Sequence, residues 1–298
     1  MTSDRTVFAL LISNGVVLAA HTILARQAHA MGVAPILYAL ASAAGATLFL
    51  LLYRAAKRQR AGLRRSEVAF GAIAGLISIA VPQVLIYSAS AYVSAGIASL
   101  AYAFPTPLTY VLAAAFALER MTLGRTIGVA IAFSGAISLA ASRSATLSGD
   151  GLWILLAMLA PVSIAAGNIY RARYWPAGST PTDLALAMSA GAALWLTAAL
   201  TMISPTAAAS IQPAGYLILL AASLLAAGGT IIYFELQRRG GIVSFSQIGY
   251  VGAVVGLASG SLILGERYSA STWLAAALIS VGVLISELLK PRVAKAAQ

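Results

Sequence analysis

The sequence predicts an all-α polytopic membrane protein with ten transmembrane helices, arranged as two inverted five-helix repeats around a central cavity. Three observations lead to this prediction. The first is composition: 60% of the 298 residues are hydrophobic and 9% are charged, whereas an ordinary soluble domain has roughly 25% charged residues. The second is a series of long uncharged stretches, and the third is an internal repeat.

The uncharged stretches mark the expected helices in order. They cover residues 7–25, 33–53, 68–90, 94–118, 126–142, 151–170, 184–203, 213–234, 243–264 and 271–286. Most reach the roughly 17 to 25 residues that a spanning helix needs, and their continuous apolar character differs from the alternation of outer-membrane strands. The first stretch extends beyond the length of a signal peptide and has a counterpart in the sixth. We therefore expect it to be helix 1 and not a cleaved signal.

The repeat appears at an ungapped offset of 147 residues. Glu119-Arg120 returns as Glu266-Arg267, Arg26 as Arg173, Ser42-Ala43 as Ser189-Ala190 and Gly135 as Gly282. With only 8 acidic and 19 basic residues in the chain, three coincident charged positions are not expected by chance. We predict one repeat at residues 1–147 (helices 1–5) and a second at 148–298 (helices 6–10). A unit that crosses the membrane five times is inverted relative to its twin, which is a transporter architecture.

The basic residues predict the orientation. If the N-terminus is cytoplasmic, 16 of the 19 basic residues fall on the cytoplasmic side, and only Arg26, Arg143 and Arg267 fall outside. This asymmetry predicts that both termini are cytoplasmic. Basic loops facing anionic lipid also account for the net charge of +11, so no nucleic-acid partner is expected. Because the chain has no Cys, disulfides and thiolate metal sites are excluded.

Each predicted repeat ends in a similar sequence block. The first has SLAYAFPTP at 99–107, LERMT at 118–122 and a stretch from Gly128 to Gly135; the second has GERYS at 265–269 and a stretch from Ala275 to Gly282. In these blocks the chain resembles the drug/metabolite transporter superfamily, in particular its ten-helix EamA-type branch, and within that branch the bacterial aromatic amino-acid exporters. The resemblance covers nearly the whole chain, and its Glu-Arg blocks are specific for the superfamily but weak evidence for substrate.

The resemblance carries implications for architecture and location. It implies a basket of helices around a central cavity with alternating access, helices 5 and 10 outside the basket, and a place in the bacterial inner membrane.

Helix 4 carries a polar and aromatic stripe that is a candidate for the cavity wall. Six side chains fall within a sector of about 100° on a helical projection: Tyr92, Ser99, Tyr102, Thr106, Thr109 and Tyr110. Such a stripe is costly against lipid, so it must face protein or water. Interhelical hydrogen bonding is the alternative for any single hydroxyl. We expect the tyrosines to face the cavity.

Candidates on the other helices are neutral polar or aromatic residues. They are Asn14, His21, Tyr38, Gln83, Tyr87, Asn168, Tyr233, Gln247 and Tyr250. Four prolines are candidate hinges, because a proline inside a helix removes a backbone hydrogen bond and broken helices often mark transport sites: Pro82, Pro105, Pro107 and Pro161. The alternative for each is a packing kink without a binding role. A lone intramembrane His is more often a packing residue than a proton carrier, and we expect that of His21.

Small residues form a ridge on helix 9, at Gly249, Gly252, Gly256 and Gly260. Such a ridge permits close approach of another helix. We expect it to pack on helix 10 or helix 8; dimerisation is the alternative. Because the duplication supplies both halves in one chain, a monomer is expected.

Missing features narrow the chemistry. No uncharged stretch contains a carboxylate, and four glutamates lie at the ends of such stretches: Glu119, Glu235, Glu266 and Glu287. No carboxylate that could couple transport to an ion is therefore evident inside a predicted membrane helix. A phosphorylated substrate would require Lys or Arg in the cavity, but Arg26, Arg171 and Arg173 lie at helix ends. No HExxH, GxSxG or P-loop motif is present, and two His cannot build a metal site without Cys. We expect neither a cofactor, nor a metal, nor an enzymatic activity.

The sequence thus predicts an exporter of small neutral or zwitterionic metabolites, in particular amino acids including aromatic ones. Its neutral polar and aromatic lining would bury an apolar side chain while hydroxyls and amides hold the polar end. One alternative is a multidrug exporter of aromatic cations, which tyrosines would bind through cation–π contacts. Another is a passive channel or a membrane-embedded assembly subunit.

Overall fold

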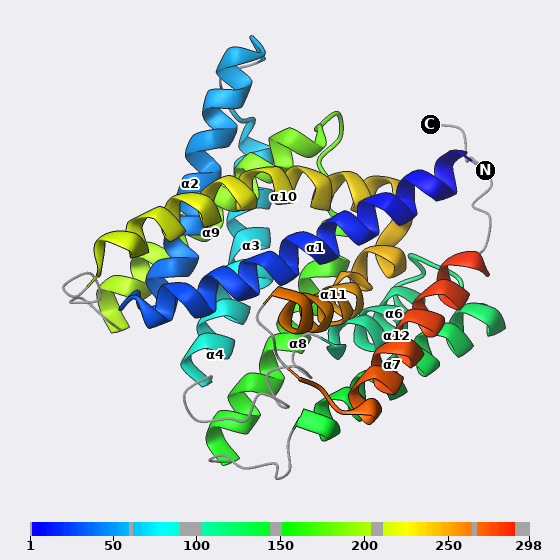
Figure 1. The fold of residues 1–298 in the computed structure, drawn as a ribbon. Coiled ribbons are helices and arrows are strands. Elements are labelled where there is room, and N and C mark those ends of the chain that lie inside the picture. Colours follow the sequence, from blue (N-terminus) through cyan, green and yellow to red (C-terminus); the bar gives the residue numbers. More distant parts are fainter. Residues whose placement is uncertain are drawn as a thin grey trace.

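The computed structural model describes residues 2–59, 62–89, 103–143, 151–203, 211–263 and 267–289, and every described secondary-structure element is a helix (Figure 1). The first half contains α1 (Thr2–Ala30), α2 (Pro35–Ala56), α3 (Arg65–Gly75), the π-helix η1 (Leu76–Ala80), α4 (Val81–Ala89), α6 (Pro105–Ala115) and α7 (Leu123–Arg143). The second half contains α8 (Gly151–Arg173), α9 (Pro181–Ile203), α10 (Pro213–Ser246), α11 (Ile248–Ile263) and α12 (Ala270–Leu288).

Within the described residues, six helices are long and apolar enough to cross a membrane. They are Arg5–Ala30, Pro35–Ala56, Arg65–Ile86, Pro181–Met202, Pro213–Ser246 and Ala270–Leu288, with shorter apolar helices at Leu123–Leu139 and Ile248–Ser259. Over the described residues, these spans confirm the predicted all-helical membrane fold. The third predicted helix is α3, η1 and α4 in succession, so it crosses as a single span that contains a π turn.

Prolines and caps set several helix starts. α2, α6, α9 and α10 each begin at a proline, Pro35, Pro105, Pro181 and Pro213, where the missing N–H has no intrahelical partner to lose. At the start of α9, the Thr180 backbone N–H donates to Asp183 Oδ2 at 2.9 Å, and the Asp183 N–H donates to Thr180 Oγ1 at 3.2 Å. This reciprocal pair satisfies donors that a helix start leaves free.

The eighth and ninth predicted helices meet at a break. α10 runs to Ser246, but Gly241 inside it has φ 76° and ψ 175°, a left-handed conformation that favours glycine. A Cβ at this position would also lie 2.6 Å from Glu119 Oε1. The ninth helix was expected from residue 243, whereas α11 begins at Ile248, because the residues after Gly241 form a short helical turn that belongs to α10.

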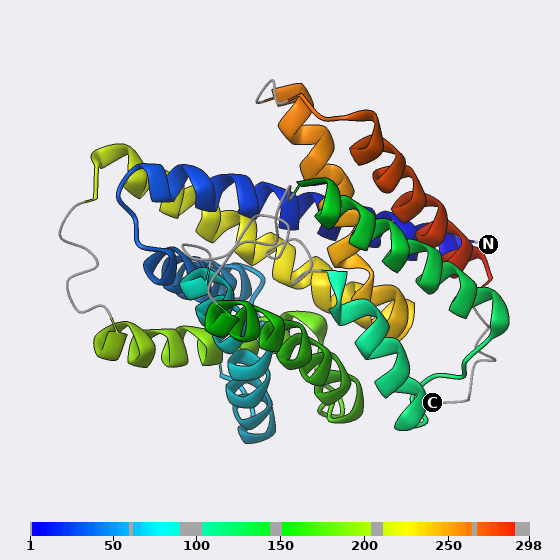
Figure 2. The same ribbon diagram turned by 90° about the horizontal axis from the view of Figure 1, so that it is seen from below.

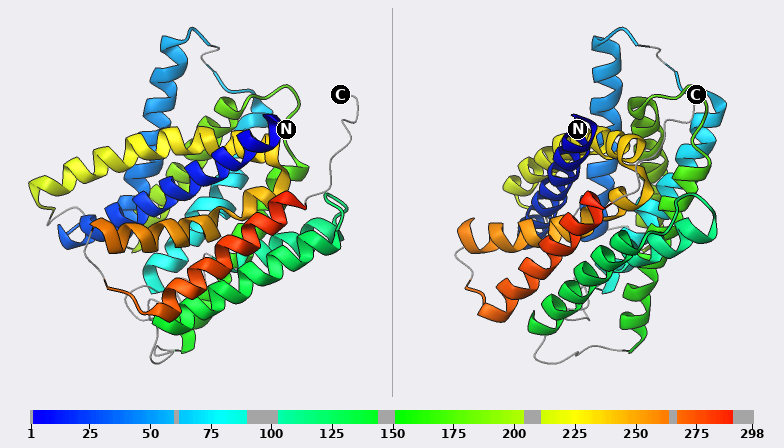
Figure 3. Two further views of the ribbon diagram at one scale, coloured as in Figure 1. Left: turned by 45° about the vertical axis from the view of Figure 1, so that its right-hand side comes forward. Right: turned by 90° about the vertical axis from the view of Figure 1, so that its right-hand side faces the viewer.

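The helices α7 and α12 lie side by side at one edge of the molecule (Figures 2 and 3). Small residues allow this: a Cβ on Gly135 would lie 2.9 Å from the Ala275 carbonyl oxygen, and one on Gly282 would lie 2.6 Å from the Gly128 carbonyl oxygen. The other extensive contacts pair α3 with α9, α2 with α10, α2 with α9, and α1 with both α10 and α11, while α8 contacts α4 and α6.

The glycine ridge of α11 faces α1. A Cβ on Gly252 would lie 2.7 Å from Leu18 Cδ2, and the Cβ of Ala19 is the neighbour of Gly256 at 4.0 Å. From the other side, Gly15 of α1 lies against Val251. The expectation that the ridge packs on helix 10 or helix 8 is therefore wrong, because the small residues of both helices allow α1 and α11 to approach each other closely.

Candidate functional site

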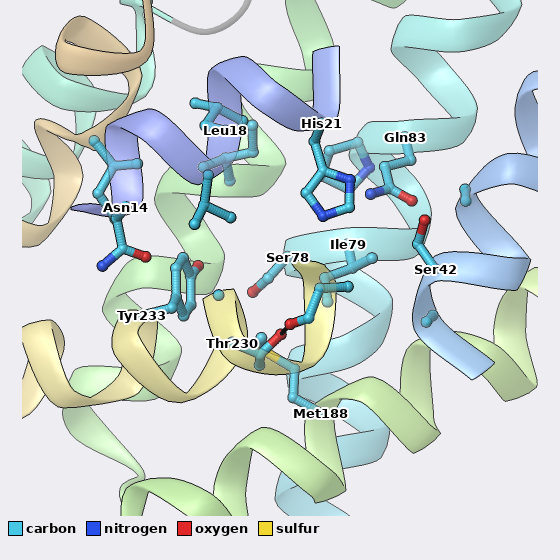
Figure 4. A pocket seen from close by; sticks show the side chains of 18 of the residues that line it. Asn14, Leu18, His21, Ser42, Ser78, Ile79, Gln83, Met188, Thr230 and Tyr233 are labelled. Atoms are coloured by element: carbon cyan, nitrogen blue, oxygen red, sulfur yellow. Dashed lines mark hydrogen bonds between the residues drawn. The ribbon is translucent and has the colours of Figure 1, made fainter. Parts of the chain in front are cut away.

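A central cavity of about 330 Å³ lies between the two halves of the chain. Its walls come from α1, α2, η1, α4 and the first residue of α6, and from α8, α9, α10 and α11 (Figure 4). The volume falls within the roughly 300 to 1,000 Å³ of small-molecule sites. No Asp, Glu, Lys or Arg occurs among the described residues that line it, so its surface is neutral and mixes aliphatic, aromatic and amide groups.

His21 and Tyr38 connect α1 to α2 at the cavity wall. His21 Nδ1 lies 2.9 Å from the Tyr38 hydroxyl oxygen, and that hydroxyl donates to the His21 carbonyl oxygen at 3.0 Å. Because one hydroxyl carries one proton, Nδ1 is then the donor to Tyr38. The two rings meet edge to face, with centroids 6.1 Å apart. These contacts hold the imidazole in one orientation.

Several polar lining groups keep acceptor atoms for a ligand. The Ser42 and Thr230 hydroxyls donate to the Tyr38 and Ala226 carbonyl oxygens of their own helices, at 2.8 and 2.6 Å. Their oxygen lone pairs therefore stay available to the cavity. Gln83 Oε1 is buried and finds no hydrogen-bond partner among the described residues. Since a buried acceptor without a donor is costly, this amide suits a donor group brought by a ligand.

The π-helix η1 places Ser78 and Ile79 on the cavity wall. In this turn the Val81 N–H donates to the Leu76 carbonyl oxygen five residues earlier. A neighbouring carbonyl oxygen, that of Ile77, accepts a hydrogen bond from the Ser163 hydroxyl of α8 at 2.7 Å. The widened turn is therefore stabilised from α8. Single π turns inside α-helices frequently occur at functional sites.

Arg171, in the last turn of α8, lies behind this wall and is fully buried, at 0% exposure. Its guanidinium donates to Gln237 Oε1 at 3.1 Å, to Asn168 Oδ1 at 2.6 Å and to the Ser78 hydroxyl. Its Cζ is 5.0 Å from the centroid of the Tyr233 ring and 5.1 Å from that of Phe245. Except for Gln237, all of these partners line the cavity.

A second group of charges, called here the Arg125 cluster, comprises Glu119, Arg125 and Glu287 with Ser244. Arg125 Nη1 lies 2.6 Å from Glu119 Oε2, and its Nη2 lies 3.9 Å from Glu287 Oε1 and donates to Ser244 Oγ at 3.0 Å. Glu119 Oε1 also accepts from the Val243 backbone N–H at 3.2 Å. The cluster thus joins the segment between α6 and α7 to α12 and to the break in α10.

Two further ion pairs lie near the end of α2. Arg54 Nη1 is 2.6 Å from Asp183 Oδ1 at the start of α9, and Arg54 is 2% exposed. Glu67 pairs with Arg64 at 2.8 Å and accepts from the Ser179 hydroxyl at 2.8 Å. In the described part of the chain, no three His, Cys, Asp or Glu side chains gather as a metal site requires.

The structure brings part of the predicted site together. The predicted residues that line the cavity are Asn14, His21, Tyr38, Gln83, Asn168 and Tyr233, with Pro82 and Pro105. The side chain of Tyr87, and the whole of Ser99 and Tyr102, lie outside the described residues.

The other described candidates lie between helices and do not line the cavity. The Thr106 hydroxyl donates to the Ser246 carbonyl oxygen at 2.8 Å, and the Tyr110 hydroxyl lies 2.8 Å from Thr126 Oγ1. Gln247 Nε2 donates to Ser286 Oγ at 2.8 Å, and Tyr250 is buried in the core. The described hydroxyls of the helix 4 stripe thus serve the interhelical alternative.

The candidate hinges differ in their setting. Pro82 is the second residue of α4, close after the π turn, and Pro161 lies inside α8, as predicted for prolines within helices. Pro105 and Pro107 lie in the first turn of α6, where a proline costs no intrahelical hydrogen bond, so the structure shows a helix start at this point.

Sequence reasoning missed several residues of the site. Ser42 and Ser189 line the cavity, and their equivalence in the repeat was a signal that could have found them. Thr230 is the repeat equivalent of the candidate Gln83, so the same offset was a signal for it. Ser78 had no such signal, because a lone hydroxyl in an apolar helix is usually bonded to its own backbone. Arg171 was placed correctly at a helix end, but its burial against the cavity wall depends on packing with α10 and η1.

Comparison with known proteins gives the first half of the chain a family resemblance. Residues 6–141 match the EamA-like transporter family, which together with the six candidate spans identifies a multi-pass membrane protein. An uncharacterized transporter of Archaeoglobus fulgidus is 25% identical over 112 residues, which are 38% of this chain and 41% of the relative. The chain therefore matches about two fifths of the length of this curated relative.

A solved crystal structure shares the fold. It aligns with 94% of this chain and 98% of its own chain, with a TM-score of 0.74 and 18% identity. At this identity the likeness describes architecture only. In sequence, residues 6–141 are EamA-like, and in fold nearly the whole chain matches a known structure.

Proposed function

We propose that the protein is an inner-membrane transporter that exports small neutral or zwitterionic metabolites, amino acids including aromatic ones, by alternating access. The observation that carries the proposal is the neutral cavity of about 330 Å³ between the two halves. Aliphatic and aromatic walls suit an apolar side chain, and amides and hydroxyls suit an α-amino or carboxyl group. The EamA-like match of residues 6–141 supports transport and leaves the substrate open.

The composition of the cavity wall supports the two inverted repeats at 1–147 and 148–298. Many lining residues are separated by the repeat offset of 147: Val17 and Ile164, His21 and Asn168, Ser42 and Ser189, Ile79 and Ala226, Pro82 and Gly229, Gln83 and Thr230, Ile86 and Tyr233. An axis that relates the halves and passes near the cavity would produce such pairs. The lining residues Ser246 and Gly249 are the repeat equivalents of Ser99 and Tyr102. Ser99 and Tyr102 therefore remain candidates for the cavity wall.

Helix pairing supports the same arrangement. In the proposed repeat α3 corresponds to α10 and α9 to α2, so the contact of α3 with α9 has its equivalent in the contact of α10 with α2. In the same way, the contacts of α1 with α10 and α11 have their equivalents in the contacts of α8 with α4 and α6. The helices α7 and α12 correspond to each other, so their contact is its own equivalent in the repeat. Within it, the contact of Gly135 with Ala275 is equivalent to the contact of Gly282 with Gly128. Alternating access would then exchange the conformations of two like halves.

The proposed orientation places both termini in the cytoplasm, on the basic-residue asymmetry. Since the chain has no Cys, single cysteines can report it. In intact spheroplasts, an impermeant thiol reagent should label Ser148→Cys and leave Arg60→Cys unlabelled until the membrane is opened. Labelling of Arg60→Cys from outside, with none at Ser148→Cys, would reverse the topology.

The cation alternative is weakened by Arg171. Cation–π binding needs a free aromatic face, but the guanidinium already lies 5.0 Å from the Tyr233 centroid and 5.1 Å from that of Phe245. A second cation there would meet like charge.

The channel alternative makes a different kinetic prediction, because a channel does not exchange substrate across the membrane in a coupled cycle.

Counterflow into proteoliposomes tests the proposal. Vesicles preloaded with unlabelled L-phenylalanine should take up labelled L-phenylalanine faster than empty vesicles, and uptake should saturate with concentration. Protein-free vesicles are the control for leak. Uptake that neither saturates nor responds to preloading would indicate a channel, and exchange of aromatic cations alone would favour the multidrug alternative.

A further inference from the structure

Arg171 carries a positive charge that no carboxylate of the described residues neutralises. The ion pairs of the described side chains involve Arg54, Arg64, Arg125, Arg238 and Arg239, and the hydrogen bonds of Arg171 go to neutral oxygens. A buried charge without a counter-charge is costly, because its interaction with water is lost and no opposite charge replaces it. The charge therefore requires an explanation beyond packing.

The guanidinium is separated from the cavity by a single layer of side chains. Ser78, Asn168 and Tyr233 each contact Arg171 and each line the cavity. In Figure 4, Ser78 extends from η1 toward the space between Tyr233 and Thr230. A charge this close to a cavity that excludes ionised residues acts with little screening, because its surroundings have a low dielectric constant.

Ser78 can transmit this charge to a ligand. Its hydroxyl oxygen accepts a hydrogen bond from Arg171 Nη1, and among the described residues no hydrogen bond donated by this hydroxyl is found. A hydroxyl that accepts from a cation is polarised and becomes a stronger donor. Asn168 is held in place from both sides, because its Oδ1 accepts from Arg171 at 2.6 Å and its Nδ2 donates to Thr109 Oγ1 at 2.9 Å.

We propose that Arg171, together with Ser78, forms a subsite that recognises the carboxylate of the substrate. The ligand class is then amphipathic molecules with a free carboxylate, amino acids among them, and amines, amides and esters of the same shape are poor ligands. The buried Gln83 Oε1, an acceptor without a donor, suits the ammonium group of a zwitterion. This inference rests on the proposed function only in placing the ligand in the central cavity.

Binding of a matched ligand series to the purified wild-type protein tests the class directly. The probes are L-phenylalanine, 3-phenylpropionate, which lacks the ammonium group, phenethylamine, which lacks the carboxylate, and L-phenylalaninamide, in which the carboxylate is neutralised. Both carboxylates should bind at least about tenfold more tightly than the amine and the amide, as loss of a charge-assisted hydrogen bond implies. Equal or tighter binding of phenethylamine would overturn the inference.

Variants then assign the effect to Arg171. Arg171→Gln should lose about tenfold or more of the affinity for both carboxylates and should not weaken phenethylamine binding, whereas Arg171→Lys should retain part of the preference. Arg238→Gln, at an exposed arginine paired with Glu235, is the matched control and should behave as wild type. A folded Arg171→Gln protein that keeps the wild-type preference would refute the assignment. If that variant does not fold, Ser78→Ala decides, because it should reduce the same preference.

The outcomes separate this inference from the proposed function. If 3-phenylpropionate binds and is transported while L-phenylalanine is not, the amino-acid proposal fails and the carboxylate subsite stands. If L-phenylalanine and its amide are transported equally well, amino-acid export stands and the subsite fails.

Discussion

Arg125 and Arg171 are both buried arginines near the ends of helices, at 3% and 0% exposure, yet their surroundings are opposite in kind. Arg125 lies between two carboxylates and ties three chain segments together. Arg171 meets only neutral oxygens and aromatic rings, beside a cavity. The comparison indicates that a charge neutralised within the protein holds helices together, whereas a charge left without a counter-ion is available to a ligand.

The sharpest way to break this comparison is to neutralise Arg125. Arg125→Gln removes the cation that pairs with Glu119 and faces Glu287, and removing one partner of a buried ion pair typically costs about 3 to 5 kcal/mol. We expect a large fall in the thermal unfolding temperature of the detergent-solubilised protein. Arg238→Gln, which breaks a surface pair, should change stability by at most about 1 kcal/mol. Wild-type stability of Arg125→Gln would show that the cluster does not hold the fold.

Changes in the predicted cavity wall should affect transport more than folding. Gln83→Ala and Tyr102→Ala should each weaken export of an aromatic amino acid, with loss of one aromatic contact costing about 0.5 to 1.5 kcal/mol beyond the lost area. Tyr87→Ala should act in the same way. Export rates are to be divided by membrane abundance measured on the same cells. A parallel loss of abundance and export would identify these side chains as packing residues.

The stability of Arg171→Gln, measured against that of Arg125→Gln, tests whether the two arginines differ in their structural role. The Gln amide can donate to one of the former partners, and the variant removes the cost of burying an uncompensated charge. We therefore expect the free energy of unfolding to change by no more than about 1 kcal/mol, far less than for Arg125→Gln. A loss as large as that of Arg125→Gln would mean that Arg171 is a structural tie.

The smallest expected effect concerns the proton gradient. No membrane-embedded carboxylate was predicted to face the cavity, and His21 is held by Tyr38 at 2.9 Å. Substrate should therefore equilibrate across proteoliposomes at equal internal and external pH, with ionophores that hold the gradient at zero. Uphill accumulation driven by an imposed pH difference, and abolished by His21→Ala without loss of binding, would instead make His21 a proton carrier.

The helical spans were predictable because their signal is composition. A stretch such as 33–53 has no charge and enough length to cross a membrane, and the structure has α2 at Pro35–Ala56. Local backbone features were less predictable. The break at Gly241 and the helix start at Pro105 depend on neighbouring segments, so the sequence pattern located the ninth helix only to within a few residues.

Site residues were predictable where a polar side chain lies in an otherwise apolar helix, because such a side chain must face protein or a cavity. Asn14, His21 and Asn168 are polar groups in apolar helices, and the structure places all three on the cavity wall. Thr106 and Tyr110 carry the same kind of signal but bond to Ser246 and Thr126. Which partner a hydroxyl takes depends on helix rotation and distance, and periodicity within one helix does not specify these.

The π turn at Leu76–Ala80 fixes the rotation of α4 relative to α3. If the same residues formed a regular α-helix instead, everything beyond the turn would rotate by about 100° about the helix axis, because the π turn holds one more residue per turn than an α-helix. Pro82 and Gln83, now on the cavity wall, would then be carried toward neighbouring helices. The π turn therefore sets which side chains of α4 a substrate meets, and straightening it at constant residue count would exchange them.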